Sequence, residues 1–456
     1  MTAIGFLTVI GLLLSAEPAP PKAVVEVEEV VYSFTPANNG AGPTWCHGST
    51  CIVRSGEHVF ASGLETLPDV KPLNNCRWLL FHRDASGWKK IAADPTGRTR
   101  EPCPLAVFAD RSVLLSANPT LFAERTSGPA RPEILAFDPT GAGATLRVLL
   151  PEWDGKPEFS EHSYRSLAAD GRNGELVLFQ NIGYTHAEWA FFDRDGKWAA
   201  RGKLVWPFGS EYEKPQPIRV CYPTVALADR AVHFCGVSDI VEPNPRWRAA
   251  KKKITGADWD YDFRRLFYTA CPDIRTGKFM PWVEIASREK TCGWITPGDL
   301  YAAPDGTVHL LWTERAIDER LRAEFFPDEK QSYALNYAVV REGKVIRRRT
   351  LVDRVERQPG VIASDGRFHV APGNRLYVVF HAAGVEAGKA VAENRILEIP
   401  ADGSPSPAAT ISLAHPLTGF FTATPRGGTA PSNVLDLFGP RGDAPLSMSY
   451  ARVRIE

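Results

Sequence analysis

The stretch Asn173-Gly174-Glu175-Leu176-Val177-Leu178-Phe179 is a polar turn followed at once by a short hydrophobic strand. Similar phrases, with Asp, Gly or Asn in the turn, begin six more times, at 56–61, 110–115, 229–234, 305–311, 373–379 and, more faintly, 432–437. A spacing of roughly 55 to 75 residues suits one four-stranded blade with its loops. The sequence therefore predicts an all-β fold, a single seven-bladed β-propeller with four antiparallel strands per blade.

The repeats place one domain over residues 45–456 rather than several independent ones. Within residues 17–44, an alternating strand at 24–34 is expected to pair with the C-terminal chain and close the ring. Loop insertions are expected in blades four and five, at 242–262 and 314–330. The first is rich in Arg and Lys, and we interpret it as a solvated basic loop, partly helical. The expected blades are 45–100, 101–153, 161–207, 219–290, 291–353, 357–414 and 418–456.

Composition and the N-terminus restrict the function. The 53 Lys and Arg balance 53 Asp and Glu, so no overall positive field favours nucleic acid, and we expect none as a partner. An apolar run at 4–14 followed by small residues is typical of a signal peptide over residues 1–16, which predicts a secreted or periplasmic protein. The run is too short to span a bilayer, so the mature chain should have no membrane span. We expect a monomer.

Eight cysteines are compatible with an oxidising compartment. Their positions suggest disulfides within blades, Cys51 with Cys76 and Cys235 with Cys271. The other four could pair between neighbouring blades, as Cys46 with Cys103 and Cys221 with Cys292, or stay free. No C-x-x-C spacing is present, and we expect neither a metal nor a cofactor.

Polar residues gather where the first strand of each blade begins. In a propeller these positions line the central channel and converge on one mouth. Such positions would ordinarily be small or apolar, whereas here they include His, Tyr, Glu and Arg, as expected of a site for a polar, anionic substrate. The expected substrate-binding residues are His47, Glu101, Glu161, Tyr164, Trp294 and Arg357. The expected catalytic residues are His162, His186, Arg219 and Tyr222.

His162 is the strongest single candidate for a catalytic residue, because it stands in a polar run directly before a strand. It could instead simply form a hydrogen bond to a loop backbone. Tyr184 and His186 follow the second strand of the same blade, in a loop that could reach the mouth. Arg219 can clamp a carboxylate and Tyr222 can exchange a proton, although a Tyr before Pro223 could also pack as a corner. Trp45 and Trp294 could stack on a sugar ring or be buried.

Two stretches, Arg83-Asp84-Ala85-Ser86-Gly87-Trp88 and Asp193-Arg194-Asp195-Gly196-Lys197-Trp198, resemble the Asp-box turn of sialidase-like propellers, a superfamily of mostly extracellular carbohydrate-active proteins. We expect structural roles for them, with Asp and Gly in the turn and Trp packed between blades.

The pair His162 and His186, followed by Tyr222 and Arg219, is similar to the arrangement in propeller-type polysaccharide lyases such as the ulvan lyases. The resemblance implies that His or Tyr removes a proton beside a uronate carboxylate, Arg neutralises that carboxylate, and the glycosidic bond is eliminated. The sequence thus predicts an exported lyase acting on a uronate-containing polysaccharide. One alternative is a glycoside hydrolase with Glu101 and Glu161 as its carboxylates. Another is a non-catalytic propeller that binds glycan or protein.

Overall fold

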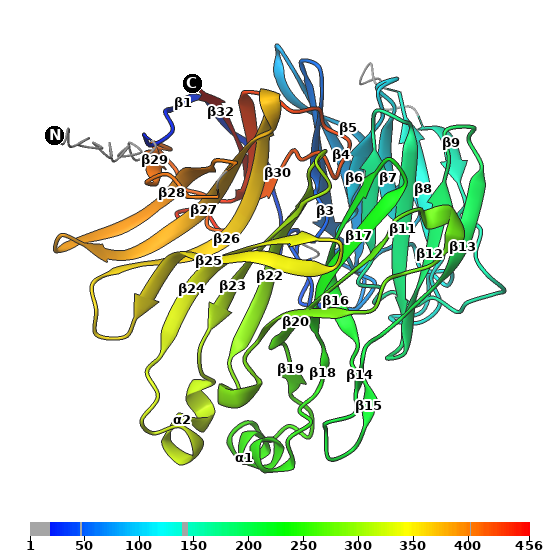
Figure 1. Cartoon of the computed structure of the whole chain (residues 1–456). Helices are drawn as coiled ribbons and strands as arrows, with labels where there is room; N and C mark the ends of the chain where they lie inside the picture. Colours follow the sequence, from blue (N-terminus) through cyan, green and yellow to red (C-terminus); the bar gives the residue numbers. More distant parts are fainter. Residues whose placement is uncertain (1–18, 46–47, 139–144, 402) are drawn as a thin grey trace, which may run out of the picture.

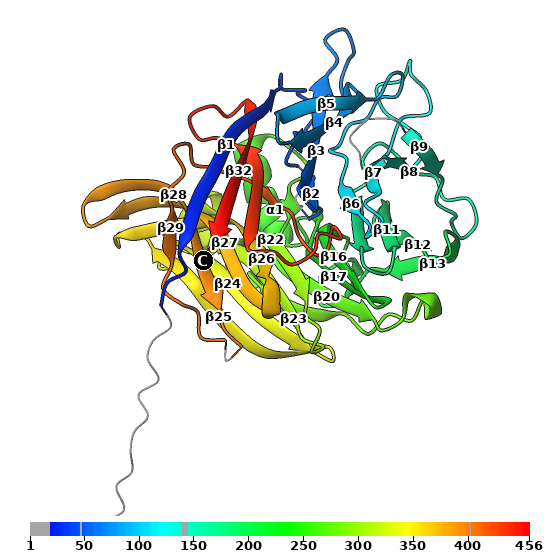
Figure 2. The ribbon, with the colours of Figure 1, turned by 90° about the horizontal axis from the view of Figure 1, so that it is seen from above.

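The computed structural model describes residues 19–45, 48–138, 145–401 and 403–456, and shows seven four-stranded antiparallel sheets arranged in a ring (Figure 1). The first strands of the blades contact one another in sequence around the ring, from β2 through β6, β10, β16, β22, β26 and β30 back to β2. Seen from above in Figure 2, the other strands of each blade fan outward from this inner ring. The predicted seven-bladed β-propeller is confirmed.

The strands of blades one to three are β2 (Ile52–Ser55), β3 (His58–Thr66), β4 (Cys76–Asp84) and β5 (Gly87–Ala93); β6 (Leu105–Val107), β7 (Val113–Ala117), β8 (Glu133–Phe137) and β9 (Thr145–Leu149); and β10 (Ser166–Asp170), β11 (Glu175–Ile182), β12 (His186–Phe192) and β13 (Trp198–Val205). Blades four and five contain β16 (Val220–Ala228), β17 (Ala231–Ser238), β20 (Arg265–Cys271) and β21 (Val283–Ser287); and β22 (Trp294–Ala302), β23 (Val308–Arg315), β24 (Ser332–Arg341) and β25 (Lys344–Val355).

Blades six and seven contain β26 (Gly360–Ala371), β27 (Arg375–Glu386), β28 (Lys389–Ile399) and β29 (Ala409–Ile411); and β30 (Phe421–Thr422), β31 (Val434–Pro440), β32 (Ser447–Ile455) and β1 (Ala23–Ser33). Every repeated phrase lies on the second strand of its blade, with its turn directly before that strand. Gly174 and Gly306 have φ of +67° and +81° in these turns, a conformation that side chains resist, which explains why the phrase begins as it does.

The N-terminal strand β1 completes the last blade. It pairs antiparallel with β32, from Ala23 opposite Ile455 to Ser33 opposite Ser447. The two strands run side by side in Figure 2. Because the first and last parts of the described chain share one sheet, the ring is closed by backbone hydrogen bonds.

The two Asp-box-like turns join the third and fourth strands of blades one and three, where they are structural. Asp84 Oδ1 accepts a bond from the Ser86 backbone N–H at 2.7 Å, and Asp193 Oδ1 accepts one from the Asp195 backbone N–H at 3.0 Å. Trp88 lies edge-on to Tyr450 of blade seven, with ring centroids 5.2 Å apart. The expected packing of a Trp between neighbouring blades is confirmed here.

All the long insertions gather at one end of the ring, at the bottom of Figure 1. They contain β14 (Phe208–Gly209), β15 (Gln216–Pro217), β18 (Ile240–Val241), β19 (Tyr261–Asp262), α1 (Pro245–Thr255) and α2 (Glu319–Phe325). Outside these insertions, short 3-10 turns occur at Ile274–Thr276, Glu289–Thr291 and Pro372–Asn374. Among the described residues, no helix is long and apolar enough to cross a membrane. The first strands of the blades also begin at this end, so the insertions surround the mouth predicted from the sequence.

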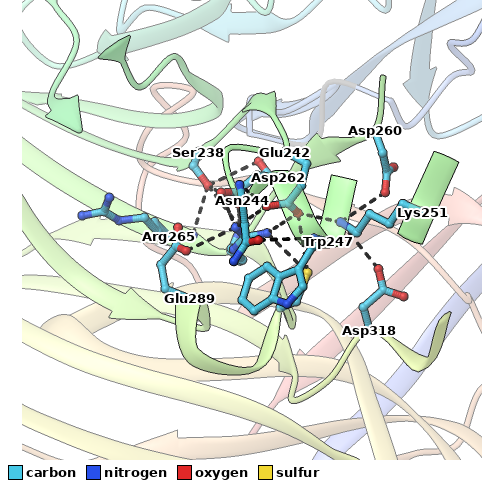
Figure 3. A network of polar contacts seen from close by, with 12 residues as sticks. Ser238, Glu242, Asn244, Trp247, Lys251, Asp260, Asp262, Arg265, Glu289 and Asp318 are labelled. Carbon is cyan, nitrogen blue, oxygen red and sulfur yellow. Dashed lines mark hydrogen bonds and ion pairs between the residues drawn. The ribbon is translucent and has the colours of Figure 1, made fainter. Parts of the chain in front are cut away.

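The basic insertion of blade four is not simply a solvated loop, because its helix α1 turns Lys251 inward. The Lys251 ammonium is 2.8 Å from Glu242, 3.2 Å from Asp260 and 3.7 Å from Asp318 of blade five, and only 3% of the residue is exposed. Arg264 binds the same Glu242 carboxylate at 2.8 and 2.9 Å. Figure 3 shows Lys251 pointing toward Glu242, Asp260 and Asp318. Burial by itself would raise the pKa of Glu242, but Arg264 and Lys251 lower it to about 2. The network fixes the insertion to blade five.

The centre of the ring is filled by a loop, residues 423–430, between β30 and β31. Arg426 bonds Asp299 of blade five and the carbonyl oxygen of Gly48, which precedes blade one, at 2.8 Å. The backbone oxygens of Arg426 and Gly427 accept bonds from Ala169 N–H of blade three and Val107 N–H of blade two, both at 2.8 Å. One loop therefore links blade seven to four other parts of the ring.

The proposed disulfides within blades are wrong. Cys235 and Cys271 do lie on the neighbouring strands β17 and β20, but their register partners are Tyr268 and Val232. The two cysteines are thus offset by three residues and point to opposite faces of the sheet. Cys51 and Cys76 are separated by β3, since Cys51 precedes β2 and Cys76 begins β4. All seven described cysteines are buried, free thiols, including Cys221 and Cys292; the possible Cys46–Cys103 pair and the predicted leader lie outside the described residues.

We expect alkylation under non-reducing conditions, with and without prior unfolding, to distinguish these thiols from disulfides. Burial raises the pKa of Cys51 and of Cys76 to about 11, so in the folded protein both should be protonated and unreactive. After unfolding in denaturant, peptide mapping should find both alkylated, together with Cys235 and Cys271. A cross-linked Cys235–Cys271 or Cys51–Cys76 peptide would contradict the structure.

Candidate active site at the mouth of the propeller

An aromatic cluster lies at the mouth, where the chain before blade one crosses toward blades three and four. The Trp45 ring centroid is 5.1 Å from that of His162, 5.0 Å from Tyr164 and 5.4 Å from Tyr222. The crossing is close because Gly48 has no side chain: a Cβ there would be 2.1 Å from the carbonyl oxygen of Pro223. Three segments distant in sequence therefore present one aromatic surface.

Tyr164 and Tyr222 occupy equivalent places where the first strands of blades three and four begin. Both have positive φ, +41° and +48°, which is unusual for a bulky side chain. Their rings meet edge-on at 5.1 Å, and they line a small pocket together with Gly48, Arg165 and Pro223. The strained backbone at both positions turns the two phenol rings toward each other at the mouth rather than along their strands.

His162 stands beside a buried carboxylate. Its Nδ1 is 3.2 Å from Glu101 Oε1, and 30% of the His162 side chain is exposed whereas Glu101 is fully buried. Ser163 also binds Glu101, through its backbone N–H at 2.7 Å and its hydroxyl at 2.6 Å. Burial by itself would raise the pKa of Glu101, but the adjacent His162 and the charge of Arg165 outweigh it and lower that pKa. Glu101 is thus an anionic partner of His162, too deep to touch a substrate.

This pairing defines what His162 can do. A carboxylate at Nδ1 orients the imidazole and stabilises the imidazolium that forms when the ring takes up a proton. The other ring nitrogen, Nε2, is then the one that can exchange a proton with a bound molecule. A partly exposed, carboxylate-oriented His beside an aromatic surface is the arrangement of a general base.

Arg219 joins the same cluster but is already neutralised. Its guanidinium is ion-paired with Asp239, and the residue is only 8% exposed. The Tyr184 ring covers it, with the guanidinium carbon 4.0 Å from the ring centroid, and the Tyr164 ring lies 5.4 Å away. Arg219 therefore stabilises the aromatic cluster through cation–π contacts with Tyr184 and Tyr164.

The aromatic surface continues across blade four to blade five. The hydroxyls of Tyr184 and Tyr261 are 3.1 Å apart, and Tyr261 leads to Phe263 at 6.3 Å between centroids. Phe263 in turn lies 4.7 Å from Trp294, the first residue of β22. Tyr184 and Trp294 are 44% and 38% exposed. A row of exposed and half-exposed rings is suited to stacking on the apolar faces of successive sugar units.

The remaining candidates make their contacts outside this cluster. His186 has its Nδ1 2.8 Å from Thr185 Oγ1 and its Nε2 3.1 Å from Glu188 Oε1, so both nitrogens are engaged within blade three. Glu161 accepts a bond from the Gly128 N–H at 3.0 Å. Arg357 is exposed in the turn between β25 and β26. His47 lies outside the described residues.

Sequence reasoning did not identify Tyr261 or Phe263 as site residues. Tyr261 is in the blade-four insertion and Phe263 directly follows it, and the Glu242 network holds this segment in place. The signal available was the aromatic content of this segment, which contains Trp247, Trp259, Tyr261 and Phe263. The many Arg and Lys residues of the insertion led instead to its interpretation as a solvated basic loop.

Fold and site together define a seven-bladed propeller with a carboxylate-paired histidine in an aromatic mouth. No protein-family model and no curated protein sequence matches the chain. Several solved propeller structures are similar to it at low identity. The arabinofuranosidase Arb93A from Fusarium graminearum is 11% identical, with a TM-score of 0.38, and the match covers 79% of this chain and 94% of that one.

Two proteases are similar to the same extent. The β-propeller domain of the trilobed protease from Pyrococcus furiosus is 11% identical, with a TM-score of 0.40 and coverage of 88% and 94%. A prolyl endopeptidase is 12% identical, with a TM-score of 0.36; the match covers 87% of this chain and spans 46% of that protein. These likenesses carry no argument about activity, which has to come from the site.

Proposed function

We propose that the protein is a carbohydrate-active propeller that binds a glycan chain over the aromatic surface at its mouth. The observation that carries the proposal is the position of His162, oriented by the buried Glu101 and set among Trp45, Tyr164 and Tyr222. The aromatic rings would hold sugar units by stacking, and His162 would exchange a proton with the unit above it. Residues 1–16 resemble a signal peptide, which supports action outside the cytoplasm.

Within this class we propose β-elimination as the reaction. His162 Nε2 would take the proton from the carbon that bears the uronate carboxylate, a double bond would form to the neighbouring carbon, and the glycosidic C–O bond would break. The leaving oxygen would receive a proton from Tyr222, whose ring is partly exposed and meets both Trp45 and Tyr164. The proton taken by His162 would return to solvent, and Tyr222 would regain its proton from solvent.

Hydrolysis by paired carboxylates is less well supported. It needs two carboxyl groups facing the scissile bond from opposite sides. Glu101 is fully buried and bound by Ser163, while Glu161 is 7% exposed and holds the Gly128 backbone. Both carboxylates are therefore committed to holding the protein together.

Binding without catalysis is the second candidate, and the state of Arg219 favours it. In the lyase scheme from the sequence, Arg219 neutralises the substrate carboxylate, yet here it is paired with Asp239 beneath Tyr184. A mouth without that free cation could hold a glycan without lowering the barrier to proton abstraction.

One experiment separates the two candidates. The purified protein is incubated with a panel of uronate polysaccharides while ultraviolet absorbance reports the unsaturated product, and glycan binding is measured on the same panel. A lyase produces absorbance that grows with time, whereas a binding propeller retains affinity without turnover. Neither turnover nor binding on any polysaccharide would rule out both.

The Trp45→Ala variant tests whether the glycan lies over the aromatic cluster. Losing this stacking surface should weaken glycan binding by about tenfold, as expected for the loss of one aromatic contact and its buried area. The measurement is a calorimetric titration with a polysaccharide that binds the wild type. Ile346→Ala is the control, since Ile346 is 55% exposed on the outer strand β25. Equal affinity in both variants would place the glycan elsewhere.

A further inference from the structure

A second group of candidate residues lies beyond Trp294, on blade five where it faces blade six. Trp294, Arg315, Tyr333 and Arg354 are successive register partners across β22, β23, β24 and β25. Directly opposed residues of antiparallel strands project to the same face of the sheet. The row therefore runs outward from the aromatic surface over three inter-strand steps, roughly 14 Å.

Within the described residues, the two cations of this row, Arg315 and Arg354, have no ion-pair partner, and neither does Arg357 in the turn after β25. Among the described parts of the chain, no acidic side chain lies within 4.0 Å of the guanidinium of Arg315, Arg354 or Arg357. The Arg315 guanidinium carbon is 5.8 Å from the centre of the Trp294 ring, and its buried Nε has no hydrogen-bond partner in the described structure. Arg219, Arg264 and Arg426, by contrast, are each paired with a carboxylate.

The row leads into a hollow between blades five and six. Its volume is about 320 Å³, and it is lined by Glu319, Gln331, Tyr333, Arg354, Glu356, Arg357 and Ile362. The two glutamates in this lining are engaged. Glu356 accepts a bond from Arg322 at 2.7 Å, and Glu319 accepts one from Gln331 at 2.7 Å. The lining holds Arg354 and Arg357, and because Arg322 binds Glu356 and Gln331 binds Glu319, both of its glutamates already have partners.

We propose that Arg315, Arg354 and Arg357, together with Tyr333, form an arginine groove that binds the carboxylates of an acidic glycan. This proposal rests on the proposed function, because the same chain would stack on the aromatic surface and reach the groove over Trp294. The planar guanidinium fork matches a carboxylate with two parallel hydrogen bonds, which an ammonium cannot do. A ligand that fits this groove is a polysaccharide with repeated carboxylates. Those carboxylates would be bound on blade five rather than by Arg219.

The test is binding of uronate oligosaccharides to the full chain, with carboxyl-reduced versions of the same oligosaccharides as neutral counterparts. The probes are oligomers of galacturonate, glucuronate and mannuronate. The wild type should bind at least one acidic oligomer about tenfold more tightly than its reduced counterpart, and salt should weaken that binding. In the double variant Arg315→Gln/Arg354→Gln, the preference for the acidic form and most of its salt dependence should disappear. Equal binding of the acidic and reduced forms to the wild type would overturn the groove.

Two controls make the result specific. Arg349→Gln removes the same charge from the same strand, five residues from Arg354 at an exposed position, and should keep the preference. Polyglutamate tests charge without sugar, and binding of polyglutamate as tight as that of the oligouronates would overturn the assignment to glycans. Unchanged melting temperatures of the variants would show that they fold. If they bind as the wild type does, the groove is wrong.

The failure of this inference and of the proposed function can be told apart. His162→Ala should keep the preference for the acidic oligomer, because His162 is not part of the groove. A wild type that shows this arginine-dependent preference but no turnover would retain the groove and contradict the lyase. Turnover with no preference for carboxylates in binding would contradict the groove alone.

Discussion

Replacing Arg426 with alanine should lower the free energy of unfolding by about 3–5 kcal/mol, the range for removing one partner of a buried ion pair. Arg426 is 4% exposed and its partner Asp299 is 2% exposed, with Nη2 of the former 2.6 Å from Oδ1 of the latter. Without the guanidinium, the buried Asp299 carboxylate would keep the backbone N–H groups of Phe368 and Leu300 as donors but lose its charged partner, and Gly48 would lose the bond to its carbonyl. Denaturant unfolding of the wild type and the variant measures the difference.

Arg375→Ala is the matched control for that loss. Arg375 pairs with Glu398 at 3.0 Å, but the two side chains are 45% and 22% exposed, so its removal should cost less than about 1 kcal/mol. A similar small loss in Arg426→Ala would show that the central loop is not what holds the blades together. The double variant Arg426→Met/Asp299→Asn should be more stable than Arg426→Ala, because it no longer buries an uncompensated charge.

Replacing His162 with alanine should reduce turnover by 10²-fold or more, the scale of general acid–base catalysis by a positioned side chain. The fold should be unaffected, since His162 is partly exposed and its loss leaves Glu101 bound by Ser163 and faced by Arg165. The measurement is steady-state kinetics on a polysaccharide that the wild type cleaves, together with binding of that polysaccharide. Binding should change little, because Trp45 and Tyr184 remain.

Glu101→Gln tests whether the carboxylate acts through His162. As a positioning residue, Glu101 should affect kcat and leave KM close to that of the wild type, because it does not reach the substrate. A purely structural role would instead lower the melting temperature and change kcat and KM together. Full turnover in His162→Ala would move the chemistry to another side chain and contradict the proposed mechanism.

The two predictions with the largest expected effects concern different parts of the propeller. Arg426 lies where the inner strands meet, so its loss is felt by the whole ring, whereas His162 lies at the exposed end of one inner strand. Rigid inner strands that present loops at one end allow a site to be changed without loss of the fold. Variants of His162, Trp45 and Arg354 should therefore remain folded, and their effects on binding or turnover can be assigned to the site.

Local sequence determined the number of blades and the position of each second strand. The phrase that includes Gly174 and its six counterparts specify a turn and a hydrophobic strand through residues next to each other in the chain, and such local preferences act before any tertiary contact forms. The same holds for the turns at Asp84 and Asp193, whose carboxylates bond their own backbone. The convergence of His162, Tyr164 and Tyr222 also followed from the repeat, because corresponding positions in neighbouring blades meet at one end of the ring.

Tertiary structure alone decided which charges are free and which residues complete the site. No local sequence pattern reveals that Arg219 is paired with Asp239 or that Lys251 is buried against Glu242. Nor does one reveal that Cys235 and Cys271 face opposite sides of their sheet. Ion pairs, register and burial depend on atoms brought together from distant parts of the chain, and their energies follow distance and solvent exposure rather than sequence spacing. For the same reason Arg315 becomes visible as a candidate carboxylate ligand only when its row across blade five is seen beside Trp294 and Arg354.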